Sequence, residues 1–268
     1  MKDTAMWDCP GFLDLPERSG KPRSSGVTHL LDKGMPISAL EARLAHVGRW
    51  ADIVKVGWGT AYVDPAIKDR VALCRSADLL VCLGGTLMEI AESQGRVDQL
   101  ADWAAGIGVT AVEVSDGLCA MGRDRKAALI AGLADRFVVL AETGAKDAGV
   151  PVVVADWVSE MESDLAAGAR WVVVEARESG SVGLYHADGS PRTELVDAIA
   201  DQLPLDRVIF EAPRKAQQAW LIRRFGPDVN LGNVPPEEIL PLETLRLGLR
   251  ADTAAVHSRS VPSARTAR

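Results

Sequence analysis

The stretch Trp171-Val172-Val173-Val174-Glu175-Ala176-Arg177-Glu178-Ser179-Gly180 decides how this chain folds. It opens with four large apolar residues, three of them β-branched, and then presents two carboxylates, a guanidinium and a Ser-Gly turn within six residues. An unbroken apolar run of this kind is typical of a strand that is buried on both faces. A buried strand that ends in charged residues is typical of the C-terminal mouth of an α/β barrel.

The same pattern recurs at three other places along the chain. In each, an apolar run ends in a glutamate and a turn follows, as in Val112-Glu113-Val114-Ser115-Asp116-Gly117, Val139-Leu140-Ala141-Glu142-Thr143-Gly144 and Val208-Ile209-Phe210-Glu211-Ala212-Pro213. We expect strands at residues 27–31, 52–60, 79–83, 110–115, 137–142, 171–174, 207–211 and 228–233. The apolar residues 150–155 could form a further strand, but we take them as a loop that leads into a helix. Eight βα units with this spacing predict an α/β fold, a (β/α)₈ TIM barrel.

The composition suits one soluble domain, since 47% of the 268 residues are apolar and 25% are charged. We expect an N-terminal arm over residues 1–20, a single barrel domain over 21–253 and a flexible C-terminal tail over 254–268. The net charge of −7 argues against a nucleic-acid partner. No apolar run is long enough to cross a membrane, so we expect no membrane partner. The cysteines form no Cys-x-x-Cys pair and no apolar leader is visible, which favours reduced thiols and a cytoplasmic location.

Acidic residues at the expected strand ends point to a bound cation. Several carboxylates that meet at one mouth repel each other unless a cation lies between them. Oxygen ligands without a Cys or His cluster favour Mg²⁺ over Zn²⁺. We therefore expect Mg²⁺ as the cofactor, held by Asp32, Glu113, Glu142, Glu175 and Glu211. The alternative is a set of salt bridges between these acids and Lys55, Lys146, Arg177 and Lys215.

Glycine turns and cations near the same strand ends suggest an anion-binding site. Gly84-Gly85-Thr86 precedes a helical stretch, and amides at a helix N-terminus bind anions well. Barrel enzymes often bind phosphate near their last two βα loops. We expect anionic substrates to be bound by Lys21, Arg23, Lys55, Gly85, Thr86, Ser179, Gly180, Arg214, Lys215, Asn230, Gly232 and Asn233. The alternative for Lys21 and Arg23 is a solvated turn, and tight turns need glycine in any case.

Together these motifs resemble a known family, the phosphosulfolactate synthases. The resemblance runs from about Lys21 to Thr253. It rests on Lys21-Pro22-Arg23, Thr28, Asp32-x-Gly34, Lys55-x-Gly57-Trp58-Gly59-Thr60, Gly84-Gly85-Thr86-x-x-x-Glu89, Glu113-Val114-Ser115-Asp116-Gly117, Glu142-x-Gly144-x-Lys146-Asp147, Glu175-Ala176-Arg177-Glu178-Ser179-Gly180, Glu211-Ala212-Pro213, Gln217-Gln218, Asn230-Leu231-Gly232-Asn233 and Leu242-Glu243-Thr244-Leu245-Arg246-x-Gly248-Leu249-Arg250. Each motif alone is weak, but the set is highly specific.

The resemblance implies a lyase that adds sulfite to phosphoenolpyruvate, in a Michael-type reaction with Mg²⁺, to give (2R)-phospho-3-sulfolactate. This reaction is the entry step of one route to coenzyme M. The resemblance also implies that Lys146 is the general acid, and we expect Glu142 and Arg177 to be catalytic beside it. Family members often carry two adjacent lysines at this point, whereas this chain has Ala145-Lys146. The lysine that serves as the acid, and with it the nucleophile, therefore stays open.

Two alternative functions also stay open. The same barrel could add another nucleophile to an enolpyruvate substrate, or it could be a non-catalytic homologue like the plant heat-stress-associated branch. So many like charges at one mouth favour catalysis, because an idle mouth need not keep them together. We expect the partners to be small anionic substrates, phosphoenolpyruvate and sulfite, and we expect the chain to form a homo-oligomer.

Overall fold

The computed structural model describes residues 10–118, 121–144 and 149–254, in which eight parallel strands close into a barrel in sequence order. The strands are β1 (Thr28–Asp32), β2 (Ile53–Val56), β3 (Leu80–Leu83), β4 (Ala111–Val114), β5 (Val138–Thr143), β6 (Trp171–Val174), β7 (Val208–Glu211) and β8 (Leu231–Val234). β8 pairs with β1, which closes the barrel. The prediction of a (β/α)₈ TIM barrel is thus confirmed.

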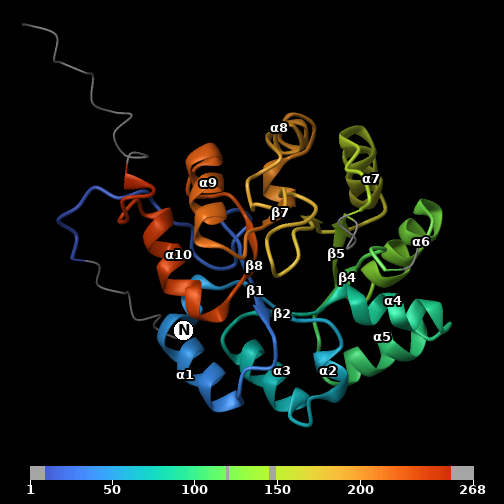
Figure 1. Ribbon diagram of the computed structural model, residues 1–268. Coiled ribbons are helices and arrows are strands. Elements are labelled where there is room, and N and C mark those ends of the chain that lie inside the picture. The colour runs from blue at the N-terminus through green and yellow to red at the C-terminus, as the bar shows by residue number, and fades with distance from the viewer. Residues whose placement is uncertain (1–9, 119–120, 145–148, 255–268) are drawn as a thin grey trace, which may run out of the picture.

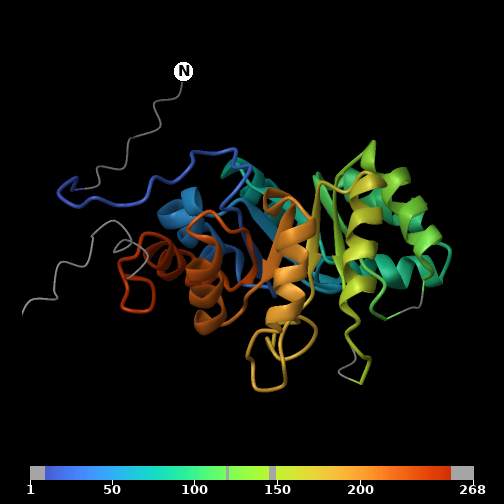
Figure 2. The ribbon, with the colours of Figure 1, turned by 90° about the horizontal axis from the view of Figure 1, so that it is seen from above.

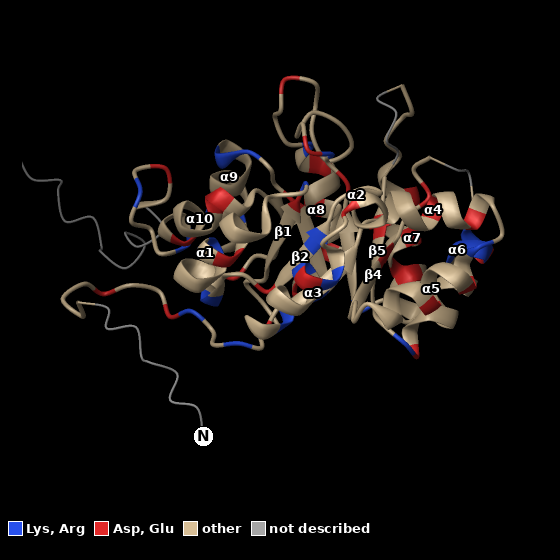
Figure 3. Cartoon of the chain, turned by 90° about the horizontal axis from the view of Figure 1, so that it is seen from below, with Lys and Arg blue, Asp and Glu red and all other residues tan. Residues whose placement is uncertain are grey.

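Helices surround the strands on all sides (Figure 1). They are α1 (Ile37–Val47), α2 (Thr60–Val63), α3 (Ile67–Ser76), α4 (Gly85–Ser93), α5 (Val97–Gly106), α6 (Arg123–Ala134), α7 (Val154–Ala166), α8 (Thr193–Gln202), α9 (Lys215–Phe225) and α10 (Ile239–Arg246). They carry both acidic and basic residues (Figure 3). Within the described residues, no helix is both long and apolar enough to pass through a bilayer. Residues 150–153 lead into α7 without forming a strand, as expected.

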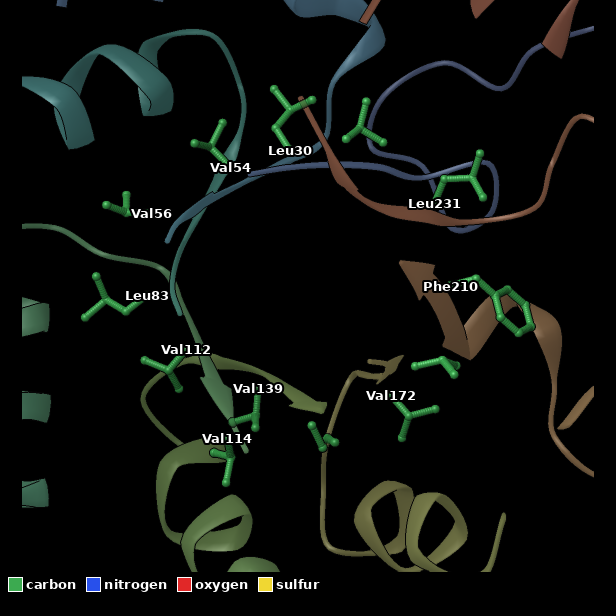
Figure 4. Packing of buried hydrophobic residues seen from close by; sticks show 14 of the residues in the cluster. Leu30, Val54, Val56, Leu83, Val112, Val114, Val139, Val172, Phe210 and Leu231 are labelled. Atoms are coloured by element: carbon green, nitrogen blue, oxygen red, sulfur yellow. The ribbon is translucent and has the colours of Figure 1, made fainter. Parts of the chain in front are cut away.

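Successive residues of each strand point alternately into the barrel and out toward the helices. The outward set packs against the helices, and Figure 4 shows part of it, including Leu30, Val54, Val112, Val139 and Phe210. The inward set forms a separate apolar plug: Val27, Ile53, Cys82, Ala111, Leu140, Trp171, Val173 and Ile209. Because this plug fills the barrel beneath the mouth, polar residues can be held above it at the C-terminal strand ends.

The N-terminal arm lies at the barrel end opposite the loop between β6 and α8 (Figure 2). Lys21 donates hydrogen bonds to the carbonyl oxygens of Gly48, Ala77 and Asp78, which precede strands. Arg23 pairs with Asp52, which also precedes a strand, at 2.9 Å. The structure therefore corrects the expectation that Lys21 and Arg23 lie at the mouth. The first nine residues, and the predicted tail apart from Ala254, lie outside the described residues.

We expect Arg18→Met to lower the free energy of unfolding by about 3 kcal/mol, because it breaks a buried ion pair. The Arg18 guanidinium lies 2.9 Å from Glu243 and 3.0 Å from Asp228, so it attaches the arm to the segment before β8 and to α10. Chemical denaturation followed by circular dichroism measures the change. Lys215→Met is the matched control: it breaks the exposed pair with Asp252 and should cost under about 1 kcal/mol. Equal losses for both variants would contradict a structural role for Arg18.

Candidate active site

The mouth of the barrel contains a cavity of about 250 Å³ at the C-terminal ends of the strands. Four neighbouring strands, β4 to β7, each bring one buried glutamate to this cavity, namely Glu113, Glu142, Glu175 and Glu211. Each glutamate lies two residues after an inward-facing residue of the apolar plug, in turn Ala111, Leu140, Val173 and Ile209. The two-residue period of a strand therefore points all four carboxylates inward, above the plug.

Lys55 from β2 faces these glutamates inside the barrel and is only 4% exposed. Its Nζ lies 3.0 Å from carboxylate oxygens of Glu113 and of Glu211, and 3.8 Å from Glu142. Burial disfavours the charged form, but the carboxylates, Glu113 first, hold the pKa of Lys55 well above its ordinary value. Lys55 therefore stays an ammonium ion at neutral pH, as the counter-charge of the glutamates. Of the two roles predicted for Lys55, the structure shows the salt bridges to the acids, with Glu113 and Glu211.

The glutamates carry more negative charge than Lys55 alone can neutralise. Burial raises the pKa of Glu113 to about 7. Burial and the neighbouring carboxylates of Glu142 and Glu211 raise the pKa of Glu175 well above its ordinary value. Two neighbouring buried carboxylates such as Glu142 and Glu175 repel each other unless a proton or a cation lies between them. This pair therefore needs a proton, or another cation, in order to stay together.

Backbone amides fix the direction of three of the carboxylates. The Gly85 N–H donates to Glu113 and the Ala176 N–H donates to Glu211, at 2.9 and 2.8 Å. The Arg177 N–H donates to Glu175. A side chain at Gly85 would not fit, because its Cβ would lie 2.2 Å from Ser115 Oγ. The Gly85 amide, predicted to bind an anionic substrate, is thus directed at a glutamate instead, while Gly85 and Thr86 both line the cavity as expected.

Three residues at the rim of the cavity have left-handed backbone conformations. The φ angles of Trp58, Arg177 and Asn233 are 52°, 53° and 52°, in the loops or strand ends after β2, β6 and β8. Such conformations cost of order 1–3 kcal/mol each and concentrate at functional sites. Asn233 is 4% exposed, and its Oδ1 has no hydrogen-bond partner in the described part of the protein. The Asn233 amide oxygen is therefore oriented to accept a hydrogen bond from, or to coordinate, a bound group.

Asp32 does not join the four glutamates, and this corrects its prediction as a metal ligand. In the β1–β2 register it lies beside Val56, which belongs to the outward set, so its side chain points toward the helices. There it pairs with Arg70 at 2.6 Å and accepts hydrogen bonds from the amides of Gly34 and Met35. Its carboxylate holds the turn after β1.

Two predicted substrate ligands in and before β8 have structural roles. Asn230 precedes the strand at the end of the barrel opposite the mouth, where its side chain accepts from the Val27 amide and donates to three carbonyl groups. Gly232 lies inside the barrel wall, where an added Cβ would come within 2.9 Å of Ile209 and 3.1 Å of His29. Both expectations are therefore corrected: Asn230 joins strand starts, and Gly232 makes room for the side chains around it.

Four other predicted ligands, in the loop after β6 and at the start of α9, lie outside the described cavity lining. Ser179 Oγ lies 2.9 Å from Ser181 Oγ, and the Gly180 carbonyl accepts a hydrogen bond from Gln217. Lys215 pairs with Asp252 at 3.0 Å. Arg214 is exposed at the start of α9. In this arrangement none of these four residues lines the cavity, whereas Arg177 and Asn233 line it as expected.

Lys146, the predicted general acid, lies outside the described residues. Trp58 does not appear among the predicted site residues, yet it is 41% exposed and lines the cavity. Charged side chains that reach strand ends from the helices were also missed, such as Arg70 in α3. Arg70 could have been found from its helical spacing with Val71 and Cys74, which places it on the buried face of α3. A charged side chain on a buried face needs a partner.

The fold and the carboxylate-lined mouth define a TIM-barrel enzyme. A family model described as (2R)-phospho-3-sulfolactate synthase (ComA) matches residues 16–252. The chain is 42% identical over 244 residues to a phosphosulfolactate synthase of Methanothermobacter thermautotrophicus, covering 89% of this chain and 95% of that protein. It is 38% identical to a phosphosulfolactate synthase of Bacillus subtilis, covering 90% and 97%. The chain therefore belongs to the phosphosulfolactate synthase family, and is an enzyme, a carbon–sulfur bond-forming lyase.

Solved structures with lower identity share the fold. A 3-hexulose-6-phosphate synthase aligns with a TM-score of 0.53 and 13% identity, over 82% of this chain and 99% of that one. A monomeric dihydrodipicolinate synthase variant aligns with a TM-score of 0.54 and 13% identity, over 88% and 75%. At this identity the likeness supports the barrel architecture alone.

Proposed function

We propose that this enzyme adds sulfite to phosphoenolpyruvate, with Mg²⁺, to give (2R)-phospho-3-sulfolactate. The observation that carries the proposal is the layer of four buried glutamates around Lys55, in a chain whose family match spans residues 16–252. Two anionic reactants can meet in such a mouth only if additional positive charge is present. A divalent cation and the cationic side chains of the mouth would supply that charge.

The donor set fits a hard cation such as Mg²⁺. The cavity offers carboxylate oxygens and the amide oxygen of Asn233, and Mg²⁺ prefers oxygen ligands. The described residues contain no ready-made group of three or more His, Cys, Asp or Glu side chains spaced for a metal. We therefore assign the ion to Glu142 and Glu175, whose mutual repulsion it would relieve. When bound, Mg²⁺ would neutralise the negative charge that develops on the substrate carboxylate.

The chain's own residues would bind the reactants and move one proton. The sulfur lone pair of sulfite forms a bond to the methylene carbon of phosphoenolpyruvate, and the double-bond electrons shift toward the substrate carboxylate. Lys146 then gives a proton to the carbon that bears the phosphate, which completes the addition. Arg177, exposed at the cavity, would attract the anions, while Lys55 keeps the glutamates in place.

The buried, free thiols of Cys74 and Cys82 support the predicted cytoplasmic location. The homo-oligomer stays a prediction.

Phosphorus NMR tests the reaction directly. Phosphoenolpyruvate, sulfite, Mg²⁺ and the purified protein should give a new phosphate-ester signal that is absent when either sulfite or Mg²⁺ is left out or when EDTA is added. Circular dichroism confirms that the protein is folded. An unchanged spectrum from folded protein would refute the proposal. Consumption of phosphoenolpyruvate only with a different nucleophile would instead establish the alternative that Ala145 leaves open.

Without Mg²⁺, we expect the thermal unfolding midpoint to fall as the pH rises from 5 to 8. Burial raises the pKa of Glu113 to about 7, from 4.5 in the unfolded chain. The raised pKa therefore contributes about 3 kcal/mol to the free energy of unfolding. This contribution is fully present below pH 4.5 and is lost as the pH rises through 7. Mg²⁺, which binds only the folded protein, should raise the midpoint at pH 8 and not at pH 5.

Glu175→Gln is the control for this metal effect, since it removes one assigned ligand and should abolish the gain at pH 8. Thermal scans in buffers of matched ionic strength, with Mg²⁺ or with EDTA, measure both effects. A gain of the same size at pH 5 and pH 8, or in the Glu175→Gln variant, would contradict a metal site at these carboxylates.

A further inference from the structure

Lys126 of α6 is one of the most deeply buried charged side chains in the described part of the protein, with 1% of its surface exposed. Its Nζ donates a 2.8 Å hydrogen bond to the backbone carbonyl of Glu142, at the C-terminal end of β5. The same Nζ forms ion pairs with Glu160 and with Asp164, both from α7, the latter at 2.8 Å. One ammonium group thus joins α6, α7 and the end of the strand that carries a cavity glutamate.

The charge of Lys126 is expensive to bury, so its partners matter. An ammonium ion has three N–H donors, and here it donates to the Glu142 carbonyl and to Glu160, while Asp164 lies within ion-pair distance. Burial lowers the pKa of Lys126, but Asp164 and Glu160 outweigh that effect and raise it above its ordinary value. Lys126 lies on the buried face of α6 with Leu129 and Ile130. An apolar residue at its position would pack α6 against the barrel without the cost of burying a charge. Helix packing alone therefore gives no reason for a lysine at this position.

The end of β5 is held from both sides. On the outer side, Lys126 binds the Glu142 carbonyl and Thr143 Oγ1 donates to Glu160 at 3.3 Å. On the inner side, Gly144 turns the chain with φ +140° against Glu175, where an added Cβ would lie 2.6 Å from the Glu175 Cβ. Rotation of the peptide group after Glu142 would redirect the Glu142 side chain. Its direction in the cavity therefore depends on the hydrogen bond outside the barrel.

We propose that Lys126 is a positioning residue of the active site: by holding the Glu142 carbonyl on the outer face of β5, it sets the Glu142 carboxylate beside Lys55 and Glu175 on the inner face. The inference rests on the proposed function, because it takes Glu142 as part of the reacting site. Lys126 itself does not line the cavity. Its substitution should therefore lower kcat more than it changes the KM for phosphoenolpyruvate.

The test compares Lys126→Met/Asp164→Asn with Asp164→Asn. Both variants lose the Asp164 charge, but only the double variant loses the donor to the Glu142 carbonyl. We expect kcat of the double variant to be about 10–100-fold below that of Asp164→Asn, with similar unfolding midpoints, as for residues that orient a ligand from behind. Equal kcat values would overturn the positioning role while leaving the proposed function standing. A wild-type enzyme without activity in the same assay would overturn both.

Lys126→Arg covers the case in which the double variant fails to fold. Arginine keeps the positive charge beside Asp164 and Glu160 but changes the reach to the Glu142 carbonyl. A lower kcat at a wild-type unfolding midpoint would support positioning. A wild-type kcat in Lys126→Arg at a wild-type unfolding midpoint would overturn the positioning role and show that Lys126 only stabilises the packing of α6 and α7.

Discussion

Replacement of Lys55 by Met should lower the free energy of unfolding by about 3–5 kcal/mol at pH 8, because it leaves the buried glutamates without their counter-charge. The Lys55 ammonium lies 3.0 Å from Glu113 and from Glu211. Without it, the pKa values of these already raised carboxyl groups would rise further. Their protonated forms contribute stability that is present at low pH and lost as the pH rises. The loss should therefore be much smaller at pH 5 than at pH 8.

Chemical denaturation of the variant and the wild type, at both pH values and with EDTA present, measures this effect. The double variant Lys55→Met/Glu113→Gln is the matched control, since removal of one carboxylate should recover part of the stability at pH 8. The same loss at pH 5 and pH 8 would show that the cavity left by the lysine side chain, rather than its charge, accounts for the change.

Replacement of Lys146 by Ala should lower kcat by about 10²–10⁴-fold, because the proposed reaction then lacks the general acid that protonates the substrate carbon. Lys146 follows β5, the strand that carries Glu142. The fold should be retained, as judged by circular dichroism and the unfolding midpoint. Lys68→Ala, on the exposed side of α3, is a control that should leave kcat unchanged. Wild-type turnover in Lys146→Ala would remove this lysine from the mechanism.

The position of the lysine can be tested further, because this chain has Ala145 where relatives often carry a lysine. Lys146→Ala/Ala145→Lys moves the amine by one residue. If activity returns in this variant, a lysine at either position can deliver the proton. If activity stays lost, the reaction depends on Lys146 itself, and Ala145 marks a real departure of this chain from the family pattern.

The repeated pattern of an apolar run that ends in an acid was enough to predict the barrel and four of the carboxylates. The reason is local, because alternation along a strand is a property of the backbone itself. A glutamate two residues after an inward apolar residue must also point inward, and this holds for Glu113, Glu142, Glu175 and Glu211. Lys55 follows the same rule after Ile53, so its place among the acids could be predicted from sequence.

The same pattern misled at Asp32, because an apolar run that ends in an acid does not show which face of the strand points inward. The register between β1 and β2 shows that the Asp32 side chain points outward. Asp32 also ends an apolar strand, but it stands one residue out of phase with the inward set, and a shift of one residue changes the face. Lys21, Arg23 and Asn230 were misplaced for a different reason. They lie in irregular segments, which have no periodicity to show the barrel end on which they lie.

By itself, the sequence determined the eight βα units, the inward direction of four glutamates and one lysine, and the family, since these follow from short-range alternation and local motifs. Only the tertiary structure decided which of the remaining charges meet them. Arg70 and Lys126 come from helices and bind the ends of strands that lie 38 and 16 residues away in the sequence. Trp58 reaches the rim through a left-handed backbone. Such contacts depend on how the helices pack against the barrel, and no local pattern encodes that packing.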